Sequence, residues 1–385
     1  MWRAFSVSVG WVAVCLFGNA PGLAQNAYIT NWKDNTVSVI NTLSNTVMGS
    51  PIPVGVKPFA AAVTPDGSKV YVVNNADSTV SVIDTATNTV IGSPIPVANF
   101  PFGLAITPDG SKVYITNYAI PAVLVIATAT NTVIGSPIPV GNFPVGAAIT
   151  PDGSKVYVTN VNSDTVSVIA TATNTVIGSP IPVGKAPYGV AVSPDSSKVY
   201  IANEFDGTVS VINTATNTVI GSPIPVAGFP QSVAVTPDGS KVYVTNLAAD
   251  AVSVIATATN TVIGSPIPVG KTPHGLAITL DGSKVYVANG GDNTVSVIDT
   301  ASSTVIGSPI PVGTEPFALG VFIRPAAGCR YQPPCLPTCP PGEHLTSNHG
   351  VLACVLYPVP RCPAGTHPVL RNERLMCVCD SLKCN

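Results

Sequence analysis

Charge is scarce in this sequence. Only 9% of its 385 residues are Asp, Glu, Lys or Arg, and the formal net charge at pH 7 is -2. Proteins that bind nucleic acid neutralise its phosphates with a basic face, and this composition does not supply one. We therefore expect no nucleic acid partner.

Cysteine is absent from most of the chain, since none lies between Cys15 and Cys329. Eight follow in the segment 329–385, and an even number in a short exported segment predicts a disulfide framework. The candidates are Cys329, Cys335, Cys339, Cys354, Cys362, Cys377, Cys379 and Cys384. The sequence thus predicts two parts. Residues 25–328 are stabilised by a hydrophobic core, and residues 329–385 form a tail stabilised by disulfides.

Long apolar runs are missing outside the N-terminus. Arg3 precedes an apolar stretch from Ala4 to Gly18, and small residues continue to Ala24. The stretch is short for a membrane span of ~20 residues but typical of a secretory signal peptide, predicted at 1–24. We expect an exported chain, periplasmic, extracellular or on the cell surface, with no transmembrane segment after cleavage.

What the sequence has instead is a repeat. The motif Tyr-x-x-Asn recurs every 43 residues, at Tyr28, Tyr71, Tyr114, Tyr157, Tyr200, Tyr243 and Tyr286. This period predicts a propeller or a solenoid. Within one unit, the ranges 59–64, 69–74, 79–83 and 89–97 are rich in β-branched residues and are separated by turn residues. Four antiparallel strands without helical periodicity predict the blade of an all-β propeller.

The number of strands predicts how the ring closes. Six complete units are flanked by three strands within 28–54 and one within 317–323. These four would form a seventh blade from both ends of the chain, which leaves no blade half-built. We therefore expect a seven-bladed propeller with a shared seam.

The outermost and innermost strands of each repeat differ in residue type: the outermost strand has prolines and the innermost strand has small residues. In the repeated ending Gly-Ser-Pro-Ile-Pro-Val, Pro94 and Pro96 lack N–H groups on the same side of the strand, which predicts an unpaired outer edge. In the first strand, Gly103 and Ala105 have small counterparts in most copies. Small side chains there are expected because blades crowd together near the axis.

The repeats resemble the YVTN family of extracellular propellers, which is related to YncE-like and surface-layer-like propellers. The motif stands as YVTN at Tyr157 and Tyr243, and TPDGSKVY precedes most copies. The resemblance covers residues 28 to 325 and implies the propeller scaffold. It implies little about activity, because members of the family differ in function.

Comparison of the copies assigns roles to the two faces of the disc. The turns after the first and third strands barely change, and we call their side the uniform face. The turns after the second and fourth strands differ in nearly every copy, and we call their side the varied face. Binding is expected on the varied face.

The candidate binding residues lead into the channel mouth or lie in the neighbouring varied turns. They are Trp32, Phe59, Phe102, Tyr118, Tyr188, Glu204, Gln231, His274 and Phe317. An aromatic funnel with few charges suits a peptide, a glycan or an apolar small molecule. The alternative is that the aromatic side chains only plug the channel.

No catalytic or metal-binding pattern is found. His274 is the only histidine of the repeat region and no Gly-x-Ser-x-Gly elbow occurs, so His274 is expected to be a lining group rather than a general base. Aspartates of the varied turns, most of them one or two positions before a Thr, are expected to bond their own turn backbone rather than a metal. They are Asp34, Asp77, Asp164, Asp206, Asp250 and Asp292. We expect neither a metal nor a cofactor.

The tail contains a small duplication, in which Cys339, His344 and Cys354 match Cys362, His367 and Cys377 in spacing. Zinc is one interpretation of these residues, and two loops stapled by disulfides are the other. Export and the shortness of the tail favour disulfides.

These observations predict a monomeric, non-catalytic exported scaffold that binds a protein, peptide or glycan through the varied face. The alternative is a periplasmic propeller enzyme of the lactonase or quinoprotein dehydrogenase type, which the family resemblance permits by analogy.

Overall fold

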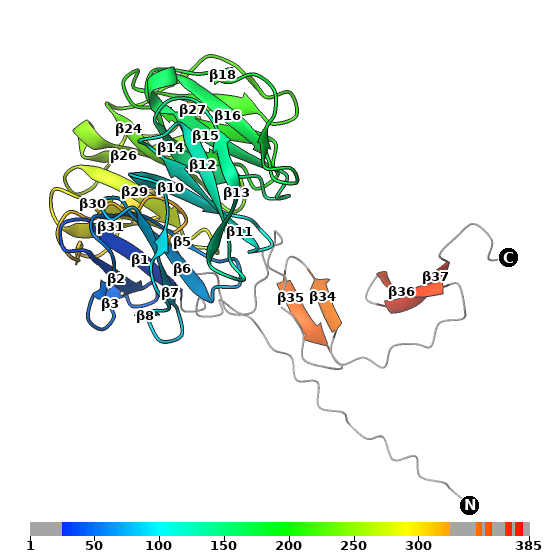
Figure 1. The fold of residues 1–385 in the computed structure, drawn as a ribbon. Coiled ribbons are helices and arrows are strands. Elements are labelled where there is room, and N and C mark those ends of the chain that lie inside the picture. Colours follow the sequence, from blue (N-terminus) through cyan, green and yellow to red (C-terminus); the bar gives the residue numbers. More distant parts are fainter. Residues whose placement is uncertain (1–24, 324–343, 349–350, 356–365, 372–373, 380–385) are drawn as a thin grey trace, which may run out of the picture. The chain divides into compact units, whose positions relative to one another are not determined.

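The computed structural model describes residues 25–323, 344–348, 351–355, 366–371 and 374–379 (Figure 1). Residues 25–323 form a seven-bladed β-propeller, as the repeats predict, with seven antiparallel sheets. The two 3-10 turns, η1 (Val161–Ser163) and η2 (Leu247–Ala249), lie on the varied face. Within the described ranges, no helix has the length and apolarity to span a membrane. The predicted signal peptide at 1–24 lies outside them.

The two inner strands of each blade follow the expected pattern. In six blades the innermost strand begins at the repeated proline: β5 (Pro58–Val63), β10 (Pro101–Ile106), β14 (Pro144–Ile149), β19 (Pro187–Val192), β24 (Pro230–Val235) and β29 (Pro273–Ile278). The second strand carries the Tyr-x-x-Asn motif: β1 (Asn26–Asn31), β6 (Lys69–Asn74), β11 (Lys112–Asn117), β15 (Lys155–Asn160), β20 (Lys198–Asn203), β25 (Lys241–Asn246) and β30 (Lys284–Asn289).

The third strands are equally regular: β2 (Thr36–Asn41), β7 (Thr79–Asp84), β12 (Ala122–Ala127), β16 (Thr165–Ala170), β21 (Thr208–Asn213), β26 (Ala251–Ala256) and β31 (Thr294–Asp299). The outer strand was expected to be continuous, and that is wrong in six of the blades. Only β13 (Thr132–Pro139) is unbroken. Elsewhere it is split in two: β3 (Thr46–Val47) and β4 (Ile52–Pro53), β8 (Thr89–Val90) and β9 (Ile95–Pro96), β17 (Thr175–Val176) and β18 (Ile181–Pro182), β22 (Thr218–Val219) and β23 (Ile224–Pro225), β27 (Thr261–Val262) and β28 (Ile267–Pro268), and β32 (Thr304–Val305) and β33 (Ile310–Pro311).

A glycine in left-handed conformation lies at the break, as at Gly92 with φ +69°. Beyond the break the edge has the expected polarity. The Val97 N–H donates to the Ser78 carbonyl at 2.9 Å. Because N–H directions alternate along a strand, the nitrogens of Pro94 and Pro96 face away from β7. Both prolines are exposed, so the outermost edge offers no donors there to another sheet.

Crowding at the axis explains the small residues of the first strand. A Cβ added at Gly103 would collide with the carbonyl of Val145 in the next blade, and one at Gly275 would collide with the carbonyl of Ala318. Neighbouring inner strands therefore approach at backbone distance.

The seventh blade closes as predicted, with both chain ends. The Tyr28 N–H donates to the Phe322 carbonyl at 2.8 Å, and Ala27 bridges Ile323. The closing segment 316–323 makes isolated bridges rather than one regular strand, since Ala318 and Gly320 have φ of 47° and 102°. Its carbonyl at Leu319 also accepts from Ala61 of the next blade, at 2.9 Å.

The tail hairpins belong to a second compact unit. One hairpin pairs β34 (His344–Asn348) with β35 (Val351–Val355), and the other pairs β36 (Thr366–Arg371) with β37 (Arg374–Cys379). Leu345 lies opposite Cys354 and Pro368 opposite Cys377, so the two copies share one register. The disulfides themselves stay a prediction, because Cys329, Cys335, Cys339, Cys362 and Cys384 lie outside the described residues.

Candidate functional site

The residue that follows the repeated proline places aromatic rings at the axis. The ring centroid of Phe59 lies 4.0 Å from that of Phe102 and 4.5 Å from that of Phe317. Phe102 also lies 6.0 Å from Tyr188, which belongs to a blade that is not its neighbour. The rings therefore meet across the centre of the disc. Gln231 and His274 occupy the same position in their blades. We call these six residues the axial cluster: Phe59, Phe102, Tyr188, Gln231, His274 and Phe317.

The members of the axial cluster differ in burial. Phe59 is only 5% exposed and packs in the core with Ala60 and Leu104, so the cluster fills the channel, as the plug alternative holds. Phe102, Tyr188 and Phe317 are half-buried and keep part of their surface accessible on the varied face. The cluster thus fills the channel and also presents a shallow aromatic surface on the varied face, which we call the floor.

Two predicted residues of the varied turns extend this floor. Trp32 lies 6.1 Å from Phe317 and Tyr118 lies 5.5 Å from Phe102, measured between ring centroids. The structure thus brings together eight of the nine predicted binding residues. The ninth, Glu204, is half-buried and near enough to Tyr188 to affect its ionisation.

His274 is the most constrained polar member of the axial cluster. Its ring stacks on Phe317 with centroids 4.0 Å apart, and its Nδ1 lies 2.5 Å from Oε1 of Gln231. Because an amide oxygen only accepts, Nδ1 carries the proton and Nε2 keeps its lone pair. Burial lowers the pKa of His274 to about 4. The negative charge of Glu315 raises this pKa, but its effect is smaller than that of burial. The imidazole is therefore neutral at pH 7 and can accept a proton at Nε2.

Gly290, which makes room for this nitrogen, was not predicted from the sequence. A Cβ at Gly290 would come within 2.6 Å of Cδ2 and 2.7 Å of Nε2 of His274. At the same place the other copies carry larger residues, namely Trp32, Asn75, Tyr118, Val161, Glu204 and Leu247. The signal was visible, since the copy with the histidine is also the copy with glycine after the motif asparagine.

The motif threonine was also missed as a positioning residue. The Thr245 hydroxyl donates to the backbone carbonyl of His274 at 2.7 Å, and Thr159 does the same for Tyr188. Each bond joins one blade to the next. The third letter of the motif thus fixes the backbone of an axial residue.

On the same face, Tyr188 and Glu204 are near enough for the charge of Glu204 to act on the phenol. Burial raises the pKa of Tyr188 well above its ordinary value, and the negative charge of Glu204 adds to this. The phenol therefore stays protonated at neutral pH and can donate a hydrogen bond. Burial also raises the pKa of Glu204.

The aspartates of the varied turns bond a neighbouring loop, so the expectation that they bond their own turn is wrong. Asp164 Oδ1 accepts from the Ala186 N–H at 2.9 Å, and Asp250 Oδ1 accepts from the Thr272 N–H at 2.8 Å. The loops between blades carry N–H groups that no strand satisfies, and these carboxylates bind them. In the ranges that the structure covers, no three His, Cys, Asp or Glu side chains are grouped as metal ligands.

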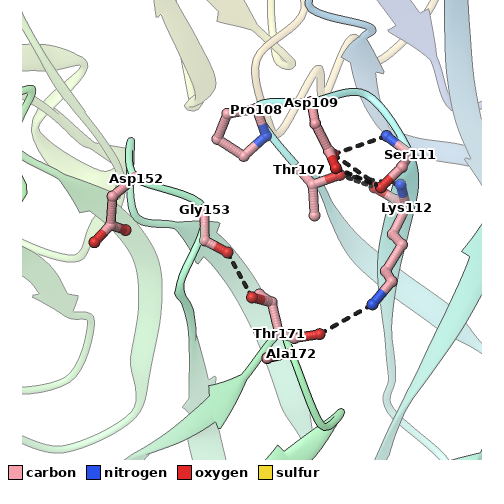
Figure 2. A pocket seen from close by; sticks show the side chains of 9 residues that line it. All are labelled: Thr107, Pro108, Asp109, Ser111, Lys112, Asp152, Gly153, Thr171 and Ala172. Carbon is pink, nitrogen blue, oxygen red and sulfur yellow. Dashed lines mark hydrogen bonds between the residues drawn. The ribbon is translucent and has the colours of Figure 1, made fainter.

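Two cavities lie away from the axial cluster. One of about 460 Å³ lies on the uniform face between the blade of β10–β13 and the blade of β14–β18 (Figure 2). There Lys112 Nζ donates to the Thr171 carbonyl at 2.9 Å, and Ser111 donates to Asp109. The lysine contact recurs between Lys155 and Thr214, so it is a joint between blades rather than a single site. The other cavity, of about 470 Å³, is lined by the outer edge at 220–225 and the turn at 259–262.

Comparisons with known proteins bear on this site. Residues 147–306 match the family model described as Lactonase, 7-bladed beta-propeller. The matched stretch contains Tyr188, Glu204, Gln231, His274 and Gly290. No curated protein matches the chain significantly.

Solved structures share the propeller at low identity. Hydrazine synthase from Kuenenia stuttgartiensis is 23% identical with a TM-score of 0.61, covering 67% of this chain and 87% of its own. The periplasmic gluconolactonase PpgL of Pseudomonas aeruginosa is 18% identical with a TM-score of 0.65, covering 79% and 100%. A candidate 6-phosphogluconolactonase from Bacteroides uniformis is also 18% identical with a TM-score of 0.65, covering 78% and 99%. These likenesses show the fold.

The family match contradicts the prediction of a non-catalytic scaffold that binds a protein, peptide or glycan, and with it the expectation that the chain is not an enzyme. That expectation rested on the lack of a nucleophile with its base, as found in serine hydrolases. A hydrolase that activates water directly needs no such nucleophile. The finding favours the lactonase alternative.

Proposed function

We propose that the chain is a lactone hydrolase and that the reaction takes place on the axial cluster beside His274. The observation that carries the proposal is the lactonase family match, because the matched stretch includes the polar members of the cluster. The gluconolactonase activity named for a protein of the same fold supports this class of reaction.

The chemistry needs one base that works on water. A water molecule attacks the lactone carbonyl while Nε2 of His274 takes its proton. The tetrahedral intermediate then collapses, the bond between the acyl carbon and the ring oxygen breaks, and the same proton passes from Nε2 to the ring oxygen. The product is the open-chain hydroxy acid, and His274 returns to its neutral form.

Two further groups support this step. Gln231 holds the proton on Nδ1, so that Nε2 is the accepting nitrogen. The protonated Tyr188 is a hydrogen-bond donor on the same floor and suits the developing oxyanion.

The experiment is a titration of acid release from δ-lactones by the full chain, with spontaneous hydrolysis subtracted. His274→Phe is the informative variant, since Phe59, Phe102 and Phe317 occupy the same position in other blades and the ring can pack. We expect kcat to fall at least about 100-fold, as removal of a general base does. The same substitution at His344, in the tail, is the matched control and should keep full activity.

If the wild-type chain does not exceed the spontaneous rate with any δ-lactone, the proposal is wrong. If His274→Phe keeps the wild-type kcat, the reaction has another centre.

We further propose that the chain is a YVTN-type propeller exported by residues 1–24 and carrying a disulfide-stapled tail. The support is the repeated motif, the apolar run from Ala4 to Gly18, and the eight cysteines from Cys329 onward. N-terminal sequencing of the exported protein should begin at Gln25. Mass spectrometry without reduction should find no free thiol in the tail.

A further inference from the structure

The varied face, where the axial cluster lies, has an excess of negative charge. Its loops carry four lysines: Lys33, Lys57, Lys185 and Lys271. They also carry eight carboxylates: Asp34, Asp77, Asp164, Glu204, Asp206, Asp250, Asp292 and Glu315. A substrate that approaches this face therefore meets a field that repels anions.

The cations of this face do not form an anion site. No arginine occurs between residues 25 and 323, so the planar fork that suits phosphate and carboxylate is absent there. Lys33 Nζ lies 2.9 Å from a carboxylate oxygen of Glu315. Lys57 Nζ lies 4.3 Å from the ring centroid of Trp32. Two of the four lysines, Lys33 and Lys57, are thus already paired with protein groups.

Aromatic rings lie on the His274 side and on the Tyr188 side of the cluster instead. Phe317 stacks on the imidazole, and Trp32 adds its ring 6.1 Å from Phe317. On the other side, Phe102 connects Tyr188 to Tyr118. A planar or apolar group that lies on these rings gains contact area without the loss of any charge pair.

We propose that the site selects uncharged lactones with an aromatic or apolar substituent and discriminates against phosphorylated sugar lactones. This inference rests on the proposed lactone hydrolase function. It separates this chain from the 6-phosphogluconolactonase type of substrate, which carries two negative charges that the varied face repels.

The test compares three six-membered lactones that differ in substituent: dihydrocoumarin, δ-gluconolactone and 6-phosphoglucono-δ-lactone. We expect kcat/KM for dihydrocoumarin to exceed that for the phosphorylated lactone at least about tenfold, the usual scale of discrimination by an apolar pocket. Unphosphorylated δ-gluconolactone should lie between them. Raising the salt concentration should narrow the gap, because it screens the repulsion.

The outcomes separate the two proposals. Equal values, or faster hydrolysis of the phosphorylated lactone, overturn the substrate inference and leave the hydrolase function standing. Hydrolysis of none of the three overturns the hydrolase function and the inference with it.

A pair of variants tests the aromatic floor. Trp32→Ala removes a half-buried ring next to Phe317, and KM for dihydrocoumarin should rise about tenfold while KM for δ-valerolactone, which has no substituent, stays the same. Phe205→Ala is the control, since this ring is 68% exposed and its ring contact is with Phe229 alone among the described residues. An unchanged ratio of the two KM values in Trp32→Ala would count against the inference.

Discussion

The hydroxyl of Tyr286 donates a 2.6 Å hydrogen bond to Oδ1 of Asn45, and the two residues stand 241 positions apart. The bond joins the last complete blade to the blade that both chain ends share. Tyr71 makes the same bond to Asn131 in the next blade. The motif tyrosine therefore connects blades around the ring, and at Tyr286 it closes the ring.

Removal of this hydroxyl should weaken the seam. In Tyr286→Phe we expect the free energy of unfolding to fall by about 1 kcal/mol, the net value of one hydrogen bond. Urea unfolding at pH 7 measures it. Tyr243→Phe is the matched control with a smaller expected loss, because Ser303 stands where the other copies have asparagine. Equal losses in the two variants would show that the bond to Asn45 adds nothing.

The same comparison predicts a stabilising change. Ser303 has φ +54°, a conformation that asparagine tolerates better than serine, and the asparagine amide would meet the Tyr243 hydroxyl. Ser303→Asn should raise the free energy of unfolding by about 1 kcal/mol. In a Tyr243→Phe background the gain should shrink, and an undiminished gain would mean that the hydrogen bond is not its source.

Acid should destabilise the propeller through His274. Its pKa is about 4 in the folded chain, against an ordinary 6.5. As the pH falls from 6.5 to 4, the unfolded chain therefore binds a proton that the folded chain does not, and about 3 kcal/mol of stability is lost. His274→Phe should lose less stability than wild type between pH 7.5 and 4.5 in urea unfolding. Parallel losses would place the acid sensitivity elsewhere.

Activity should depend on the space at Gly290. Gly290→Ala brings a methyl group against Nε2 of His274, so lactone hydrolysis should fall at least about tenfold. Val161→Ala, at the same loop position of another blade, should leave the rate unchanged. Urea unfolding of both variants checks that the fold is kept. Wild-type hydrolysis by Gly290→Ala would remove Nε2 from the proposed reaction.

The sequence predicted the propeller in detail because each strand repeats the same physical requirement seven times. Prolines mark the outer edge, small residues mark the crowded axis, and Tyr28 with Phe322 closes the seam. The split of the outer strand was not predicted, although the glycine at its break was visible. The glycine does not decide the split, because Gly135 in the unbroken β13 has the same left-handed conformation, with φ +68°.

The sequence indicated which side chains gather near the axis, but not the chemistry proposed for them. The differences between repeats on the varied face indicated Trp32, Tyr188 and His274. The neutral state of His274 depends on burial, and its tautomer depends on Gln231 in another blade. Neither can be read from the sequence of one repeat. The space at Gly290 depends in the same way on how a loop passes over a ring. Both features are contacts between residues that lie apart in the sequence. The sequence of the repeat does not show which of its residues come together in the fold.

The seam has a consequence for how the molecule is made. Tyr28 is among the first propeller residues to be synthesised, and its partner Phe322 is among the last. The inner edge of β1 stays unpaired while six further blades are synthesised. During that time another strand can pair with it incorrectly. The prolines of the outermost strands do not protect this inner edge. The growing chain is therefore most prone to misassembly until its final repeat is synthesised.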